Sequence, residues 1–191
     1  MKNKFLLLTL LLTLLFVTPA FSAAPDPKGA FGFSWDDSAE AVKTKALSLK
    51  LNLLDDRTDK AKGDRLLVFA GEAVGYNGMF MLRCYKDKLY SVAVTMRDTP
   101  SFAKYDEELN GMTKKYGKPS EHKDTEELTM TSWRAGETTV SVGKFTSKNK
   151  ETGETEYITS SLHIKMSVAS VVNRTGKNQL EIGRASCRER V

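Results

Sequence analysis

Histidine and cysteine, the side chains most often used in catalysis, are scarce in this 191-residue chain. His122 is expected in a loop, and His163 is expected on the polar side of the last strand, so both should be exposed. Cys84 shares its strand side with Phe80 and Leu82, which predicts a buried, inert thiol. No G-x-S-x-G motif is present, and no histidine is placed to activate a nucleophile. We therefore assign no catalytic residue from the sequence.

Metal sites have little support in the pattern of acidic and sulfur-containing residues. Four aspartates lie close together but lack the alternating ligands and central glycine of a calcium loop; they are Asp55, Asp56, Asp59 and Asp64. Met79 and Met81 share one side of a strand, and thioethers suit copper(I). The same pair serves equally well as core or interface filler. Copper binding stays a minor alternative, and no metal ligand or cofactor is assigned.

A surface patch is the stronger candidate for function. The side chains of Met79, Met81 and Tyr85 are expected on the side of their strand opposite Phe80 and Leu82. Trp133 is expected to join them, because it lies on the opposite side of its strand from Met130. Methionine and aromatic side chains on an uncovered sheet face are typical of a binding surface. The alternative is that these residues fill a second small core.

The elements that must position these residues follow from hydrophobic periodicity. Asp37 and Glu40 form a capping box before a helix that carries Val42, Ala46 and Leu47. Residues 55–64 are expected to form a polar loop. Three strands follow at 65–75, 79–86 and 89–97, with Asn77-Gly78 as the first hairpin turn. In the third strand, Tyr90, Val92, Val94 and Met96 are predicted to share one side.

The second half repeats this order. Thr99 and Pro100 open a helix that ends at Gly117. Its apolar stripe comprises Phe102, Tyr105, Leu109, Met112 and Tyr116. Strands are predicted at 127–134, 138–146 and 156–168. In the last strand Leu162, Ile164, Met166 and Val168 are expected to face inward, with Ser161, His163, Lys165 and Ser167 outward.

These elements predict a single α+β domain over residues 23–180. Its halves, about 31–98 and 99–168, each read as a helix followed by three strands. We predict a tandem helix–three-strand repeat that forms one antiparallel sheet with both helices packed on one face.

The first 22 residues have the pattern of a cleavable secretory signal peptide. Lys2 and Lys4 precede an apolar run at 5–17 that is shorter than a bilayer span of about 20 residues. Pro19 ends the run, and cleavage is expected after Ser22; a retained N-terminal anchor is the alternative. The mature protein is therefore expected to be soluble and periplasmic, or secreted, without a stable membrane anchor.

The last residues look foreign to the rest of the chain. Residues 182–191 look like the in-order translation of a common short-read sequencing adapter, and Glu181 fits the preceding bases, so 181–191 is expected to be non-native and native sequence to end near Leu180; a real basic tail is the alternative. The formal net charge is +5. Residues 1–22 contribute +2 and residues 182–191 contribute another +2, which leaves +1. The remainder has no clustered basic face, which argues against nucleic-acid binding.

Four segments resemble small uncharacterised periplasmic proteins of proteobacteria. They are Phe-Gly-Phe-Ser-Trp at 31–35, Ser-Ala-Glu-Ala-Val at 38–42, Tyr-Gly-Lys-Pro at 116–119, and Trp133. The resemblance implies a periplasmic location and an α+β repeat fold, and it implies no catalytic residues.

The sequence favours an exported binding or protein-interaction domain without catalytic activity. Its partner would be another envelope protein or a small ligand. A periplasmic hydrolase that uses carboxylates is the alternative, and a copper-binding protein is the minor one.

Overall fold

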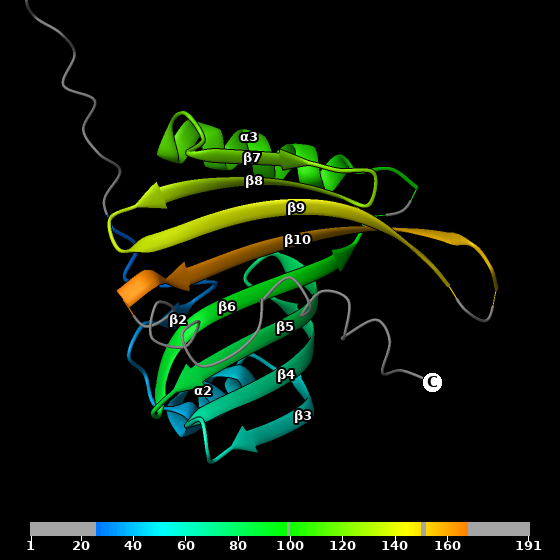
Figure 1. Cartoon of the computed structure of the whole chain (residues 1–191). Helices are drawn as coiled ribbons and strands as arrows, with labels where there is room; N and C mark the ends of the chain where they lie inside the picture. The colour runs from blue at the N-terminus through cyan, green and yellow to red at the C-terminus, as the bar shows by residue number, and fades with distance from the viewer. Residues whose placement is uncertain (1–25, 99, 150–151, 168–191) are drawn as a thin grey trace, which may run out of the picture.

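The computed structural model describes residues 26–98, 100–149 and 152–167. The predictions made for 1–22, Thr99, Val168 and 169–191 lie outside these residues. The described chain forms an eight-stranded antiparallel sheet, a two-stranded sheet and two helices, so the predicted α+β class and the single shared sheet are confirmed (Figure 1). Neither helix is long and apolar enough to span a membrane among the residues described.

The elements run in a simple order along the chain. A small hairpin, β1 (Gly29–Ala30) and β2 (Phe33–Ser34), comes first. The first half continues with α2 (Ala39–Ser48), β3 (Asn52–Asp59), β4 (Asp64–Ala73), β5 (Tyr76–Tyr85) and β6 (Lys88–Arg97). The second half comprises α3 (Ala103–Tyr116), β7 (Glu121–Asp124), β8 (Leu128–Ala135), β9 (Thr138–Lys148) and β10 (Thr155–Lys165). The strand order in the large sheet is β3-β4-β5-β6-β10-β9-β8-β7.

Each helix is followed by four strands rather than the predicted three. The sequence pattern does not reveal β3, since residues 55–59 look like part of a polar loop, and it does not reveal the short β7. Both are edge strands whose side chains are mostly exposed, so neither carries an apolar alternation. Charged residues on such edges discourage pairing with another chain, which explains why these strands look like loops in sequence.

Both helices pack on the same face of the sheet, as predicted, and lie behind it in Figure 1. Val42 and Ala46 of α2 are fully buried in the core with Phe69, Phe80 and Leu82. The predicted stripe of α3 is confirmed: Tyr105 is buried on Trp133 and Val142, and Phe102, Leu109, Met112 and Tyr116 pack around them.

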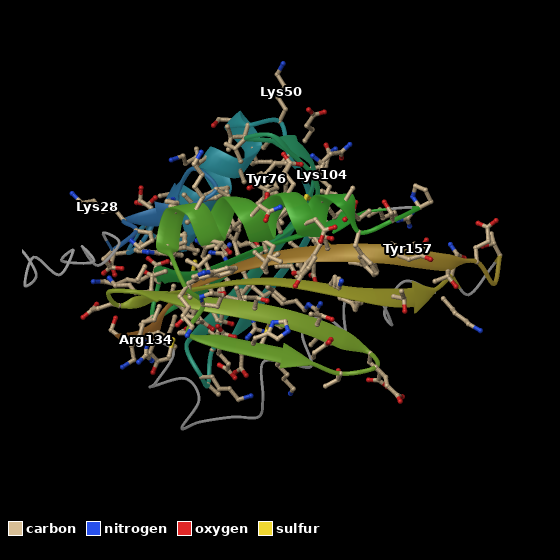
Figure 2. All side chains as sticks on the ribbon, turned by 90° about the horizontal axis from the view of Figure 1, so that it is seen from above. Lys28, Lys50, Tyr76, Lys104, Arg134 and Tyr157 are labelled. Atoms are coloured by element: carbon tan, nitrogen blue, oxygen red, sulfur yellow. The ribbon has the colours of Figure 1, made fainter. Side chains whose placement is uncertain are left out.

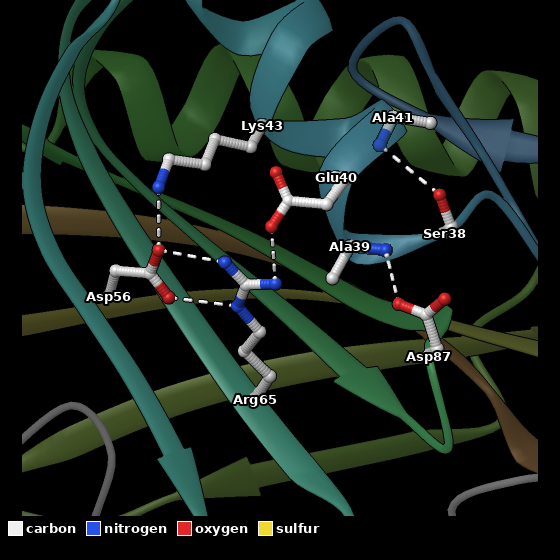
Figure 3. A network of polar contacts seen from close by, with 8 residues as sticks. All are labelled: Ser38, Ala39, Glu40, Ala41, Lys43, Asp56, Arg65 and Asp87. Atoms are coloured by element: carbon white, nitrogen blue, oxygen red, sulfur yellow. Dashed lines mark hydrogen bonds and ion pairs between the residues drawn. The ribbon is translucent and has the colours of Figure 1, made fainter.

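The start of α2 differs from the prediction. Ser38, not Asp37, is the N-cap, and its hydroxyl accepts a hydrogen bond from the amide of Ala41. The amide of Ala39 donates to the carboxylate of Asp87, which lies in the β5–β6 turn (Figure 3). At the other end, Leu47 is half exposed rather than part of the buried stripe. The helix is therefore anchored by its first turn and by Val42 and Ala46.

A polar clasp joins α2 to the first two strands of the sheet (Figure 3). Arg65 donates two hydrogen bonds of 2.8 Å to the carboxylate of Asp56 and one of 2.7 Å to Glu40. Lys43 of α2 approaches the same Asp56 carboxylate at 2.7 Å. Arg65 and Lys43 hold the pKa of Asp56 well below its ordinary value. Asp56 thus remains an anion that binds helix and sheet together.

Replacing Arg65 with methionine tests this clasp. We expect the free energy of unfolding to fall by about 1–2 kcal/mol, because hydrogen bonds between charged groups are lost while Asp56 keeps only Lys43. Urea unfolding at neutral pH gives the value. Lys62→Met is the matched control, because the exposed pair of Lys62 and Asp59 should contribute almost nothing. Equal losses in the two variants would contradict the clasp.

The turn between β4 and β5 lies three residues before the predicted Asn77-Gly78 turn. Ala73 pairs with Tyr76, so the turn residues are Val74 and Gly75, both at positive φ (49° and 83°). Asn77 and Gly78 lie inside β5 instead. A side chain at Gly78 would meet the backbone oxygen of Thr95 at 2.2 Å, so this glycine serves close strand approach rather than turning.

A β-bulge reverses one side chain of β6. The register shifts between Arg83 and Cys84, so that Cys84 pairs with Leu89. Leu89 therefore faces the helices together with Val92, and Tyr90 turns to the opposite face, where it packs on Ile164. The prediction that Tyr90 shares a side with Val92 is wrong, because an unbroken alternation cannot show a bulge.

Candidate functional site

The sheet face opposite α2 and α3 carries a continuous apolar row. The register aligns Val68 of β4 with Met81 of β5, Met81 with Ala93 of β6, and Ala93 with Leu162 of β10. Leu66 and Met79 pack beside this row. We call the surface formed by Leu66, Val68, Met79, Met81, Ala93 and Leu162 the helix-free face.

The row becomes polar where it passes into the second half of the sheet. Leu162 pairs with Ser141, and Ser141 with Ser132. The hydroxyl groups of Ser132 and Ser141 are 2.8 Å apart and hydrogen-bonded, and both residues are buried. At this register the apolar row therefore ends at Leu162 of β10.

The centre of this surface is buried. Val68, Met81 and Ala93 are only 8 %, 6 % and 7 % exposed. No described helix lies over them, since both helices lie behind the sheet in the view of Figure 1.

The structure assembles only part of the predicted patch. Met79 and Met81 are on the helix-free face, and Tyr85 lies nearby in the cluster of Tyr90 and Ile164. Trp133 is not part of it. Its ring is 1 % exposed beneath α3, and its indole N–H donates to the carbonyl of Gly117 at 3.0 Å. Trp133 pairs with Val140 of the core, and this places it on the helix side.

Cys84 is buried in the helix-side core, as predicted. The thiol is 0 % exposed, and burial raises its pKa to about 12. A nucleophilic cysteine needs a lowered pKa and access. Cys84 therefore acts as a small apolar core residue.

His163 contradicts the prediction of an exposed histidine. It pairs with Val92 and Val140 and faces the helices, where it is 7 % exposed. The ring of Phe31, at the tip of the β1–β2 hairpin, packs edge-on against it at 4.9 Å. Burial, with a smaller effect of Lys115, lowers the pKa of His163 to about 4. Neither ring nitrogen has a hydrogen-bond partner among the described residues.

The side chains of β10 face the sides opposite to those predicted. Ile164 and Leu162 are apolar but pack on the helix-free side, with Tyr90 and Ala93. The helix side carries polar residues: Thr159 donates to the buried carboxylate of Asp98 at 2.8 Å, whereas Ser161 and His163 are buried without a hydrogen-bond partner among the described residues. Both sides of β10 are therefore largely buried, and the apolar parity does not identify the core.

Further contacts connect the hairpin, the sheet and α3 above His163. Phe31 also packs edge-on against Tyr76 at 4.9 Å. Tyr76 reaches towards α3 (Figure 2) and shares a hydrogen bond with Glu108. Phe31 takes up a φ of 51°, which is unfavourable for a bulky residue. These contacts seat the hairpin tip over the histidine.

His122 lies in β7 and not in a loop, and it is exposed as predicted. Its Nδ1 is 2.9 Å from the hydroxyl of Thr131, which is 3.4 Å from that of Tyr105. The nearest hydroxyl partner is thus part of the packing beneath α3. His122 is on the edge strand of the sheet, whereas His163 is on β10 near the middle, so the two histidines do not form one site.

The four aspartates that lack the spacing of a calcium loop each have a cationic partner. Asp55 pairs with Arg57, Asp56 with Lys43 and Arg65, Asp59 with Lys62, and Asp64 with Arg83 at 4.0 Å. In the described part of the chain no three histidine, cysteine or acidic side chains gather as a metal-binding group.

The carboxylate-enzyme alternative needs two cooperating acids. Burial raises the pKa of Asp64 and of Glu108. Asp64 pairs with Tyr85 at the end of the helix-free face, whereas Glu108 belongs to α3 on the other side. Paired glycosidase carboxylates lie within about 10 Å across one substrate, so two acids on opposite sides of a sheet do not meet this requirement.

Comparisons with known proteins supply no relative. No protein-family model, no curated protein and no solved structure matches the chain. The resemblance to small periplasmic proteins therefore stays an expectation. The helix-free face is the feature that best supports a function.

Proposed function

We propose that this protein is an exported, non-catalytic binding domain whose helix-free face holds an extended apolar segment of a partner in the cell envelope. The observation that carries the proposal is the aligned apolar row of Val68, Met81, Ala93 and Leu162, which lies on the sheet face away from both described helices. Flat apolar surfaces of this type, bordered by polar groups, are typical of protein-interaction sites.

The rest of the chain supports binding rather than chemistry. The buried thiol of Cys84 and the neutral ring of His163 are held in packing roles. Each helix is followed by four strands, which supports the proposal that the two halves are a tandem repeat. A repeat of this kind would supply the broad sheet on which the face is built.

Photo-crosslinking in intact cells tests the proposal. A photoreactive residue at Leu66 or Leu162 should give one adduct of the same mass from both positions. Leu47, half exposed on α2, is the matched control and should not give that adduct. Substituting Leu66 with glutamate should remove the adduct formed from Leu162. Equal labelling from Leu47, or none from either face position, would reject the face as the binding site.

Export is tested separately. We expect protein recovered from the periplasmic fraction to begin at Ala23, since cleavage after Ser22 is predicted. Mass spectrometry of the N-terminal peptide gives the answer. Recovery of the chain from the cytoplasmic fraction with Lys2 and Lys4 still present would contradict an exported function.

A further inference from the structure

We propose that the tip of the β1–β2 hairpin, Phe31 and Gly32, is a cover over His163 that acid releases. At neutral pH the ring of Phe31 lies on the imidazole. In acid the tip leaves the imidazole, and water then solvates the charged ring. The device lies on the helix side of the sheet and is independent of the partner site proposed for the helix-free face, so either can fail without the other.

His163 is held neutral by its surroundings. Its side chain is 7 % exposed, and neither ring nitrogen has a hydrogen-bond partner among the described residues. Charging a buried ring without acceptors is unfavourable until water reaches it. Burial accordingly lowers the pKa of His163 to about 4. A movement that hydrates the imidazole therefore becomes more favourable as the pH falls.

The hairpin tip is the part of the surroundings best placed to move. Phe31 touches the imidazole edge-on, with 4.9 Å between the ring centroids. Phe31 is only half-buried and Gly32 is exposed, so the tip can leave without displacing a fully buried side chain. Phe33 of the same hairpin is 2 % exposed in the helix-side core and anchors the remainder.

The backbone of the tip is strained while it covers the histidine. Phe31 and Gly32 both have positive φ, 51° and 83°, and they connect the paired residues Ala30 and Phe33. A two-residue turn of this kind favours asparagine or glycine at its first position, and a bulky side chain there is unfavourable. Release of Phe31 relieves this strain, which opposes the loss of its ring contacts.

Hydrogen bonds to the large sheet hold the base of the hairpin. The amide of Asp36 donates to the carbonyl of Leu89 at 3.2 Å, and the amide of Leu89 donates to the carbonyl of Asp37 at 2.9 Å. Lys165 of β10 forms an ion pair with Asp36 at 2.7 Å. These contacts keep the base in place when the tip moves.

The groups around the imidazole do not stabilise its charged form. Lys115 of α3 opposes protonation through its own charge. The neighbours of His163 on β6 and β9 are Val92 and Val140. The hairpin residues 29–34 (GAFGFS) have no ionisable side chain. Solvation of the imidazolium therefore has to come from water.

A second titratable group lies next to the hairpin tip and needs a control. Tyr76 packs edge-on against Phe31 and shares a hydrogen bond with Glu108. Burial raises the pKa of Glu108, so this carboxylate also takes up a proton as the pH falls. A variant at Glu108 separates its effect from that of His163.

Fluorine NMR of 4-fluorophenylalanine incorporated at Phe31 in the purified protein provides the test. A dissolved neutral gadolinium chelate speeds relaxation of the fluorine when the tip is released. With a pKa of about 4 under the tip and 6.5 in water, release becomes more favourable by about 100-fold between pH 7 and pH 4. We expect the released fraction to rise by about tenfold or more within that limit. An unchanged fraction would overturn the inference.

Matched controls locate the change. The same probe at Phe33 should stay buried at both pH values, and a parallel response there would overturn a movement confined to the tip. Glu108→Gln should keep the response at Phe31, whereas His163→Gln should abolish it. Loss of the response in Glu108→Gln, or its persistence in His163→Gln, would overturn the role of His163.

A second measurement decides if His163→Gln does not fold. Carbon-13 NMR of the imidazole gives the pKa of His163 in wild type and in Phe31→Gly, where glycine tolerates the positive φ. Removal of the covering ring should move the titration midpoint upward by about one pH unit or more. Val74→Gly is the matched control, because Val74 is half exposed beside Gly32 and also has a positive φ. An unchanged midpoint in Phe31→Gly, or an equal rise in Val74→Gly, would overturn the inference.

Discussion

Lowering the pH from 6.5 to 4 is expected to reduce the free energy of unfolding by about 3 kcal/mol through His163 alone. The pKa of His163 is about 4 in the folded chain, against an ordinary value of 6.5. Between pH 6.5 and pH 4, His163 binds a proton in the unfolded chain but not in the folded chain. The free energy of unfolding therefore falls by about 1.4 kcal/mol per pH unit. Below pH 4 both states are protonated, and this slope ends.

Other groups act in this pH range, so the effect is read as a difference between variants. Glu108 and Asp64 have raised pKa values and stabilise the folded chain as the pH falls, which opposes the effect of His163. Lys115 adds to the burial effect on His163. Urea unfolding of wild type and of His163→Gln, each at pH 6.5, 5.5 and 4.5, isolates the histidine.

His122→Gln is the matched control, since His122 is exposed at the sheet edge. We expect it to keep the wild-type dependence on pH, while His163→Gln loses the extra slope. Parallel pH profiles for wild type and His163→Gln would show that His163 is protonated in the folded chain, and they would contradict the burial described for it.

Replacing Asp98 with alanine is expected to cost about 2–4 kcal/mol, because three buried or half-buried donors lose their acceptor at once. The Asp98 carboxylate accepts hydrogen bonds from the amides of Lys104 and Tyr105 at 3.0 and 3.1 Å, and from the hydroxyl of Thr159 at 2.8 Å. It therefore caps the first turn of α3 and ties the helix to β10.

The measurement is again urea unfolding at neutral pH, with Asp106→Ala as the control. Asp106 is an exposed acid in the first turn of the same helix, so its removal tests only the helix dipole and should cost less than about 1 kcal/mol. Asp98→Asn should be intermediate, because its oxygen can still accept. Equal costs for Asp98→Ala and Asp106→Ala would contradict the capping role.

The capping of α3 also shows where sequence reasoning is sufficient and where it is not. The spacing of Tyr105, Leu109 and Met112 predicts the buried stripe correctly, because a helix with one apolar side packs that side against the sheet. The acceptor for the first turn is Asp98, at the end of the preceding strand, and Phe102 at the N-cap position makes no side-chain hydrogen bond. Such a long-range cap leaves no local signal.

The sheet is predictable in type but not in register. Alternation in β5 and β6 indicates antiparallel pairing, but the bulge that turns Tyr90 over depends on packing between strands. The edge strand β3 is not predicted, because Asp56 and its neighbours are charged residues held by ion pairs and give no apolar alternation. The prediction for His163 is wrong because β10 has two buried sides. Met79 and Met81 lie on the side opposite Phe80, as their parity predicts, and Met81 is buried there in a small cluster with Val68 and Ala93, as in the alternative of a second small core.

Photo-crosslinking from Leu66 and from Leu162 in intact cells tests the helix-free face most directly. We expect one adduct of the same mass from both positions, and we expect Leu66→Glu to remove the adduct formed from Leu162. No adduct from either position, or the same adduct from the half-exposed Leu47 of α2, would contradict a binding site on this face.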